Sequence, residues 1–78
     1  MDDWSISQFC TVAGINRKTE YRWRKEGKGP AYTLQIGKHT YVRYPIGLAL
    51  LWINQFRPER AEAAISLWLD TAPDEVRR

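Results

Sequence analysis

The sequence has only one cysteine, Cys10, and one histidine, His39, among its 78 residues. A single cysteine excludes an internal disulfide and a metal site built from several cysteines, and it fits a reducing compartment. One histidine cannot make a structural zinc site, because such a site needs about four ligands. A Gly-rich phosphate loop and a histidine–carboxylate cluster beside a nucleophile are also missing. We therefore expect no enzyme activity, no metal and no cofactor.

Long apolar runs are lacking as well. The most apolar stretch, residues 46–53, is far too short to span a bilayer, and the start MDDWSISQF is acidic, unlike a signal peptide. We expect a soluble cytoplasmic protein. The length leaves room for one small domain, and four Trp, four Tyr and two Phe predict an aromatic core.

Positive charge is concentrated in one part of the chain. Residues 16–43 contain eight Lys or Arg and two Glu, a net charge of +6, whereas the whole chain carries +3. The rest of the chain is therefore acidic. A local basic excess is typical of a surface that binds nucleic acid, although charged runs often do no more than keep a helix face solvated.

The first two helices have clear start and stop signals. Ser5 and Gln8 form a capping-box pattern, with Trp4 placed to pack on Phe9, and Gly14 ends the first helix. Asn16 can cap a second helix that Gly27 closes. Gly-x-Asn between two helices indicates a helix-turn-helix. We interpret Cys10, on the apolar stripe of the first helix, as a small buried hydrophobe and not as a nucleophile.

After Gly29-Pro30 the apolar period changes from that of a helix to that of a strand. Alternation predicts strands near residues 32–36 and 40–43, joined by a tight turn at Gly37-Lys38. A two-stranded hairpin is unstable alone, so it must lie against the helices and leave its tip in solvent. Lys38, His39 and Arg43 lie at or near that tip, where they can serve either for solubility or for contact with DNA, and His39 can equally be a plain surface residue.

Two further helices are predicted. The third begins near Tyr44-Pro45 and ends near Phe56, and its apolar residues extend far enough round the helix to need cover on more than one side. The fourth spans residues 58–69 and can cover the third helix within the chain, or contact a second copy or another protein. We divide the chain into a core at 1–56, this helix at 57–70 and a polar tail at 71–78.

This order of elements resembles the excisionase and MerR-like winged helix-turn-helix families over about residues 4–55. The resemblance is carried by Ser5, Gln8, Gly14, Ile15, Asn16, Thr19, Tyr21, Arg22, Trp23, Glu26, Gly27, Gly29, Pro30, Gly37, Lys38 and Trp52. It departs from the pattern at Glu20, where the families usually have Val or Ile, and at Tyr44-Pro45-Ile46. Either the second helix is slightly rotated, or Glu20 pairs with a neighbouring arginine.

The resemblance implies an α+β fold, mostly α, of three core helices and a two-stranded β-hairpin wing, here with an extra C-terminal helix. It also implies a sequence-specific double-stranded DNA-binding protein: a phage or mobile-element excisionase, a recombination directionality factor that binds cooperatively and bends DNA for a site-specific recombinase (integrase). A transcription regulator at a promoter operator is the alternative, and a protein-binding subunit acting through the C-terminal helix is a third. Self-association on DNA, or a homodimer through that helix, would accompany these functions. The expected DNA contacts are Arg17, Lys18, Tyr21, Arg22 and Arg24 to bases and phosphates, and Lys25, Lys28, Lys38, His39 and Arg43 to the backbone.

Overall fold

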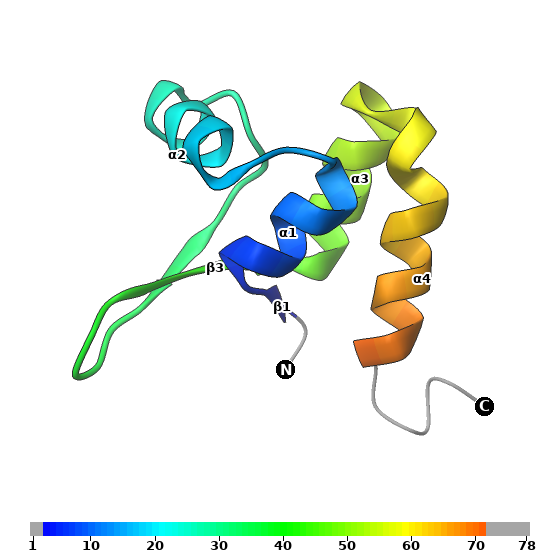
Figure 1. Ribbon diagram of the computed structural model, residues 1–78. Coiled ribbons are helices and arrows are strands. Elements are labelled where there is room, and N and C mark those ends of the chain that lie inside the picture. The colour runs from blue at the N-terminus through cyan, green and yellow to red at the C-terminus, as the bar shows by residue number, and fades with distance from the viewer. Residues whose placement is uncertain (1–2, 72–78) are drawn as a thin grey trace.

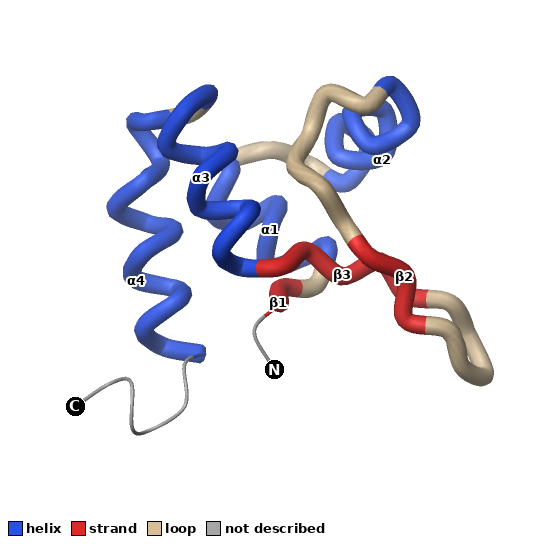
Figure 2. The backbone as a smooth tube through the Cα atoms, turned by 180° about the vertical axis from the view of Figure 1, so that it is seen from behind, coloured by secondary structure: helices blue, strands red, loops and turns tan. Residues whose placement is uncertain are grey.

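The structure is a computed structural model that describes residues 3–71. It is α+β and mostly helical, as predicted, with four α-helices and a three-stranded antiparallel sheet within these residues. Helix α2 and the hairpin β2–β3 lie on one side of α1, and α4 lies on the other side (Figure 1). The view from behind shows the same arrangement, with the hairpin extending away from the helices (Figure 2).

The predicted capping signals are confirmed. Helix α1 (Ile6–Ala13) begins with a full capping box: the Gln8 N–H donates to Ser5 Oγ at 3.2 Å, and the Ser5 N–H donates to Gln8 Oε1 at 2.9 Å. Helix α2 (Arg17–Glu26) begins with the Thr19 N–H donating to Asn16 Oδ1 at 2.8 Å. Gly14 and Gly27 end the two helices with φ of 71°, a left-handed conformation that glycine adopts at little cost.

The sheet contains a strand that the sequence did not reveal. Strands β2 (Thr33–Gln35) and β3 (Tyr41–Pro45) form the expected hairpin, and the short strand β1 (Asp3–Trp4) pairs with the other edge of β3. Trp4 lies opposite Tyr44 in this pairing, and both side chains are buried. A two-residue strand is too short to show a periodicity, so only the tertiary pairing defines it.

Two predicted boundaries are wrong. The hairpin loop runs from Ile36 to Thr40, and Gly37 does not have positive φ, so the tight two-residue turn at Gly37-Lys38 is not formed. Helix α3 (Ile46–Phe56) begins after Pro45 and not at Tyr44. Tyr44 stays extended because it pairs with Trp4, and because a residue before proline disfavours the helical conformation.

The fourth helical segment also differs from its predicted bounds. Residues Pro58–Arg60 form a 3-10 turn, η1, and helix α4 follows at Ala61–Thr71. Thr71, which was predicted to begin the polar tail, is the last residue of this helix. The rest of the predicted tail, residues 72–78, lies outside the described residues. Helix α4 packs against α1 and α3, and Ala64 is fully buried between them.

Arg60 ties this segment to the first helix. Its guanidinium donates from Nε to the Val12 carbonyl at 3.0 Å and from Nη2 to the Thr11 carbonyl at 2.9 Å. Carbonyls in the last turn of a helix have no partner within the helix, so Arg60 satisfies two of them with a favourable charge. A Cβ at Gly14 would lie 3.1 Å from Arg60 Nε, so the glycine also makes room for this contact.

The core is aromatic, as predicted. It is built from buried residues of β1, α1, β3, α3 and α4: Trp4, Phe9, Val12, Ala13, Tyr44, Ile46, Ala49, Ile53 and Ala64. The Phe9 and Tyr44 rings stack with their centroids 4.3 Å apart. Cys10 is buried beside this core, as expected, and burial raises the pKa of its thiol.

Candidate nucleic-acid interface

One face of α2 carries an exposed row of basic side chains. Arg17, Tyr21 and Lys25 follow one another at intervals of four residues, and Lys18 and Arg22 form a neighbouring row with the same spacing. Residues four apart lie above one another on a helix, so these five side chains share one side. All five are exposed. We call this set the basic face.

The opposite side of α2 faces the protein. Trp23 is half-buried and its ring lies 5.7 Å from that of Trp52 on α3, with the two planes tilted by 51°. The Trp52 indole donates to the Lys28 carbonyl at 3.2 Å, just beyond the end of α2. These contacts fix the rotation of the helix, so that the basic face is directed into solvent.

Glu20 is a buried charged residue of α2. Its side chain is only 2% exposed, yet it is fully partnered. Arg24 Nε donates to Glu20 Oε2 at 2.8 Å, and the Tyr44 hydroxyl donates to the same oxygen at 2.5 Å. The sequence left open whether α2 is slightly rotated or Glu20 pairs with a neighbouring arginine; the structure shows the pairing, with Arg24. We call Glu20, Arg24 and Tyr44 the buried triad; it joins α2 to the root of the hairpin.

The triad predicts a loss of stability at alkaline pH. Burial, and then the hydrogen bond to Glu20, raise the pKa of Tyr44 well above the ordinary tyrosine value of about 10. Below about pH 10 the phenol is protonated in both states, so the stabilisation is complete. Above that pH the unfolded chain loses the proton while the folded chain holds it, and the free energy of unfolding falls by up to about 1.4 kcal/mol per pH unit.

Urea unfolding between about pH 9 and pH 11 measures this effect. The Tyr44→Phe variant lacks the titrating group and serves as the reference. We expect the stability difference between the natural chain and the variant to shrink by about 1 kcal/mol or more across this range. A stability difference between the natural chain and the variant that does not change with pH would contradict the prediction.

The structure gives Arg24 and Arg43 roles inside the protein. Arg24 is in the triad, its guanidinium lies 5.8 Å from the Tyr32 ring centroid, and the hydrogen bond to Glu20 raises its pKa. Arg43 donates to Asp3 Oδ1 from Nε at 3.0 Å and from Nη2 at 2.8 Å, which ties β3 to β1. Both were expected at the DNA; in the structure both lie in ion pairs, and their side chains are exposed by only 15% and 29%.

The other expected contacts are exposed. Lys28 follows α2, with its Nζ 3.4 Å from a Glu26 carboxylate oxygen, and Lys38 and His39 lie in the hairpin loop. The His39 and Tyr41 rings meet edge to face with their centroids 6.3 Å apart. Arg17 also donates to Ser7 Oγ at 3.2 Å, which links the basic face to α1. The hairpin and helix α2 lie on the same side of α1 (Figure 1).

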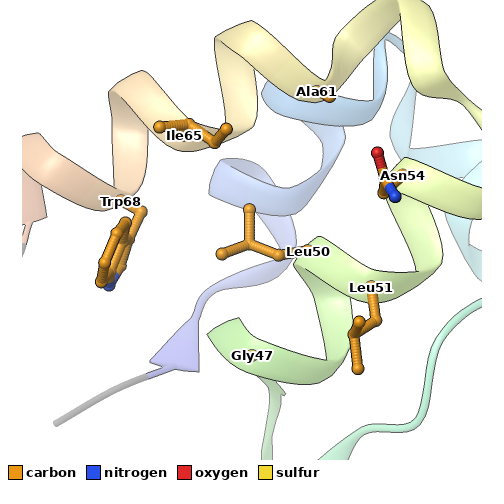
Figure 3. A pocket seen from close by; sticks show the side chains of 7 residues that line it. All are labelled: Gly47, Leu50, Leu51, Asn54, Ala61, Ile65 and Trp68. Carbon is orange, nitrogen blue, oxygen red and sulfur yellow. The ribbon is translucent and has the colours of Figure 1, made fainter.

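A second surface lies on the far side of the molecule. An apolar groove of about 490 Å³ runs between α3 and α4, lined by Gly47, Leu50, Leu51, Asn54, Ala61, Ile65 and Trp68. Leu50 extends from α3 toward Ile65 and Trp68 of α4 (Figure 3). Leu51 remains 67% exposed and Ile65 48% exposed at the groove, so α4 covers the apolar surface of α3 only in part.

Across residues 3–71, His, Cys, Asp and Glu side chains do not gather in groups of three or more that could hold a metal ion. None of the helices in this range is both long enough and apolar enough to cross a membrane.

The chain matches no known family model, and comparison with the curated proteins and with the solved structures gives no match.

Proposed function

We propose that this chain binds double-stranded DNA as a small winged helix-turn-helix. The observation that carries the proposal is the basic face of α2, which the packing of Trp23 and the buried triad direct into solvent beside a hairpin with Lys38 at its tip. A helix of this width fits the major groove, and the hairpin can reach the backbone or the neighbouring minor groove. Helices α1 and α3 form the support.

The residues divide by the contacts that they can make. Arg17, Lys18 and Arg22 are long donors on the first two turns of α2, and we assign them to base edges and nearby phosphates. Tyr21 lies between them and under the Lys25 ammonium, whose Nζ is 5.4 Å from the ring centroid. Lys25, Lys28, Lys38 and His39 hold the backbone in this proposal, so their effect does not depend on base sequence.

A salt titration of DNA binding tests the proposal. Each phosphate that a cation neutralises releases counterions, so the logarithm of the affinity falls linearly with the logarithm of salt concentration. The exposed cations Arg17, Lys18, Arg22, Lys25, Lys28 and Lys38 predict a slope of up to about −5. Fluorescence anisotropy with a labelled duplex measures it. Binding that does not respond to salt, or no binding at low salt, would reject the proposal.

The difference between Lys38 and Arg43 gives a sharper prediction. Lys38→Ala removes an exposed charge at the hairpin tip, so DNA affinity should fall about 3- to 10-fold for all sequences alike, with an unchanged unfolding midpoint. Arg43→Ala removes the same charge but breaks the pair with Asp3, so the unfolding midpoint should fall while affinity changes less than about 3-fold. The two variants together show whether location or total charge sets the affinity.

For the biological role, we propose an excisionase-type recombination directionality factor that binds in adjoining copies near an attachment site and acts with a recombinase. Bending costs a small protein free energy that contacts between neighbouring copies can offset. A nuclease footprint over a fragment with the integration site and adjacent promoters tests this role. Several phased protections beside the integration site support it, whereas one compact protection over a promoter indicates a transcription regulator.

The groove between α3 and α4 favours a second function, self-association. Helix α4, which forms one wall of the groove, lies on the other side of α1 from α2, so a second copy bound there leaves α2 free for DNA (Figure 1). Leu51→Asp places a charge on this apolar surface and should shift the chain toward monomer in sedimentation velocity, with an unchanged affinity of one copy for a short duplex. A natural chain that is monomeric both free and on long DNA would reject this function.

A further inference from the structure

The hairpin carries apolar side chains that the core covers less and less toward its tip. Tyr32 lies just before β2, with its ring centroid 6.3 Å from that of buried Tyr44; Leu34 lies within β2, and Ile36 is the first residue of the loop. Leu34 is directly opposite Val42 on β3, which packs against the core. The exposed fraction rises toward the tip, from 42% for Tyr32 to 55% for Leu34 and 79% for Ile36.

The outermost of these side chains stands in a loop that has a cation and no acidic residue. Ile36 begins the loop that contains Lys38 and His39, and the sequence from Ala31 to Val42 has no acidic residue. A single exposed apolar residue on a surface needs no explanation, but Ile36 is the most exposed large hydrophobic residue of the described chain and stands in a loop with a cation. That combination is complementary to DNA, where phosphates line the grooves and the apolar faces of the bases are stacked between successive base pairs.

The hairpin is firmly attached at its root. Tyr44 of β3 donates to Glu20 of α2, and Arg43 of the same strand donates to Asp3 of β1. The tip, in contrast, projects away from the helices (Figure 2). A hairpin held in this way can transmit a force from its tip to the body that holds α2 on the DNA.

We propose that Ile36 is a wedge that enters between two base pairs from the minor groove and kinks the duplex. The inference rests on the proposed DNA binding and adds the residue that bends the duplex. Proteins that bind the minor groove insert isoleucine and similar side chains at a base step, unstack it and bend the DNA toward the major groove. Lys38 and His39 hold the flanking phosphates in this arrangement, and pyrimidine–purine steps, which are easily kinked, are the preferred target.

The experiment uses a duplex of about 30 base pairs with a central TA step, donor and acceptor dyes at its ends, and 2-aminopurine at the step. Energy transfer reports bending, and 2-aminopurine emission reports unstacking. At saturating protein and low salt, we expect the natural chain to increase both signals. Ile36→Ser should bind within about 3-fold of the natural affinity, but should lose more than about two thirds of both increases.

Two controls separate the wedge from other roles. Lys38→Ala should weaken binding and still give both full signals at saturation, because it leaves the wedge in place. An unchanged unfolding midpoint of Ile36→Ser would show that the exposed side chain is not needed for folding.

Three outcomes would overturn the inference. If Ile36→Ser bends and unstacks the duplex as the natural chain does, Ile36 is no wedge. If the natural chain binds without either signal, the wedge is rejected while the proposed DNA binding stands, whereas no binding rejects both. If Ile36→Ser abolishes only cooperative binding, Ile36 contacts a second copy of the chain instead.

Discussion

Replacing Glu20 by alanine is expected to lower the free energy of unfolding by about 3 to 5 kcal/mol. The substitution leaves the Arg24 guanidinium, whose side chain is only 15% exposed, without its counterion, and it removes the acceptor of the buried Tyr44 hydroxyl. A domain of this length has a total stability of roughly 4 to 12 kcal/mol, so the variant should be partly or wholly unfolded at 37 °C. Urea unfolding followed by tryptophan fluorescence measures the loss.

Two variants make this result specific to the triad. Glu26→Ala removes a carboxylate from the same helix, but Glu26 is exposed and its ion pair is with exposed Lys28, so we expect a change below about 0.5 kcal/mol. Glu20→Gln keeps an acceptor for Tyr44 while losing the charge, so its stability should lie between those of the natural chain and Glu20→Ala. A Glu20→Ala variant as stable as Glu26→Ala would show that the triad contributes nothing.

The triple variant Lys18→Ala, Arg22→Ala, Lys25→Ala is expected to reduce DNA affinity by at least about 100-fold at low salt. All three side chains are exposed on the basic face, so the unfolding midpoint should not change. The salt dependence should become shallower by up to about 3 in slope, because three cations no longer displace counterions. Anisotropy titrations at several salt concentrations give both quantities.

The matched control keeps the charge and changes the group that carries it. Lys18→Arg with Lys25→Arg preserves all four cations of the basic face, and affinity should remain within several-fold of the natural chain. An equal loss in this control would mean that side-chain shape, and not charge, dominates. A triple variant that binds as well as the natural chain would remove α2 from the proposed interface.

The sequence by itself determined the local structure of the first half of the chain. Ser5, Gln8 and Asn16 fixed where α1 and α2 begin, and Gly14 and Gly27 fixed where they end, because caps and left-handed glycines act through hydrogen bonds within a few residues. The α+β class followed from the change in apolar period after Pro30. The basic face was also predictable, since helical spacing alone places Arg17, Lys18, Tyr21, Arg22 and Lys25 on one side.

Only the tertiary structure decided which cations are exposed and which are paired inside the protein. Arg24 and Arg22 are two residues apart in the same helix, yet the first pairs with buried Glu20 while the second is exposed. Arg43 was predicted at the hairpin tip, but the short strand β1 brings Asp3 to it across 40 residues of sequence. Ion pairs of this kind depend on which elements meet in space, and sequence spacing carries little information about such contacts.

The same reason accounts for where α3 begins and for the fact that α4 covers the apolar surface of α3 only in part. Tyr44-Pro45 could begin a helix locally, but pairing with Trp4 and the hydrogen bond to Glu20 keep Tyr44 in a strand. The pattern of the third helix called for cover on more than one side, and α4 supplies it on one side, leaving Leu51 exposed. Periodicity shows that an apolar face must be covered, whereas the packing of the whole chain decides how much of it is.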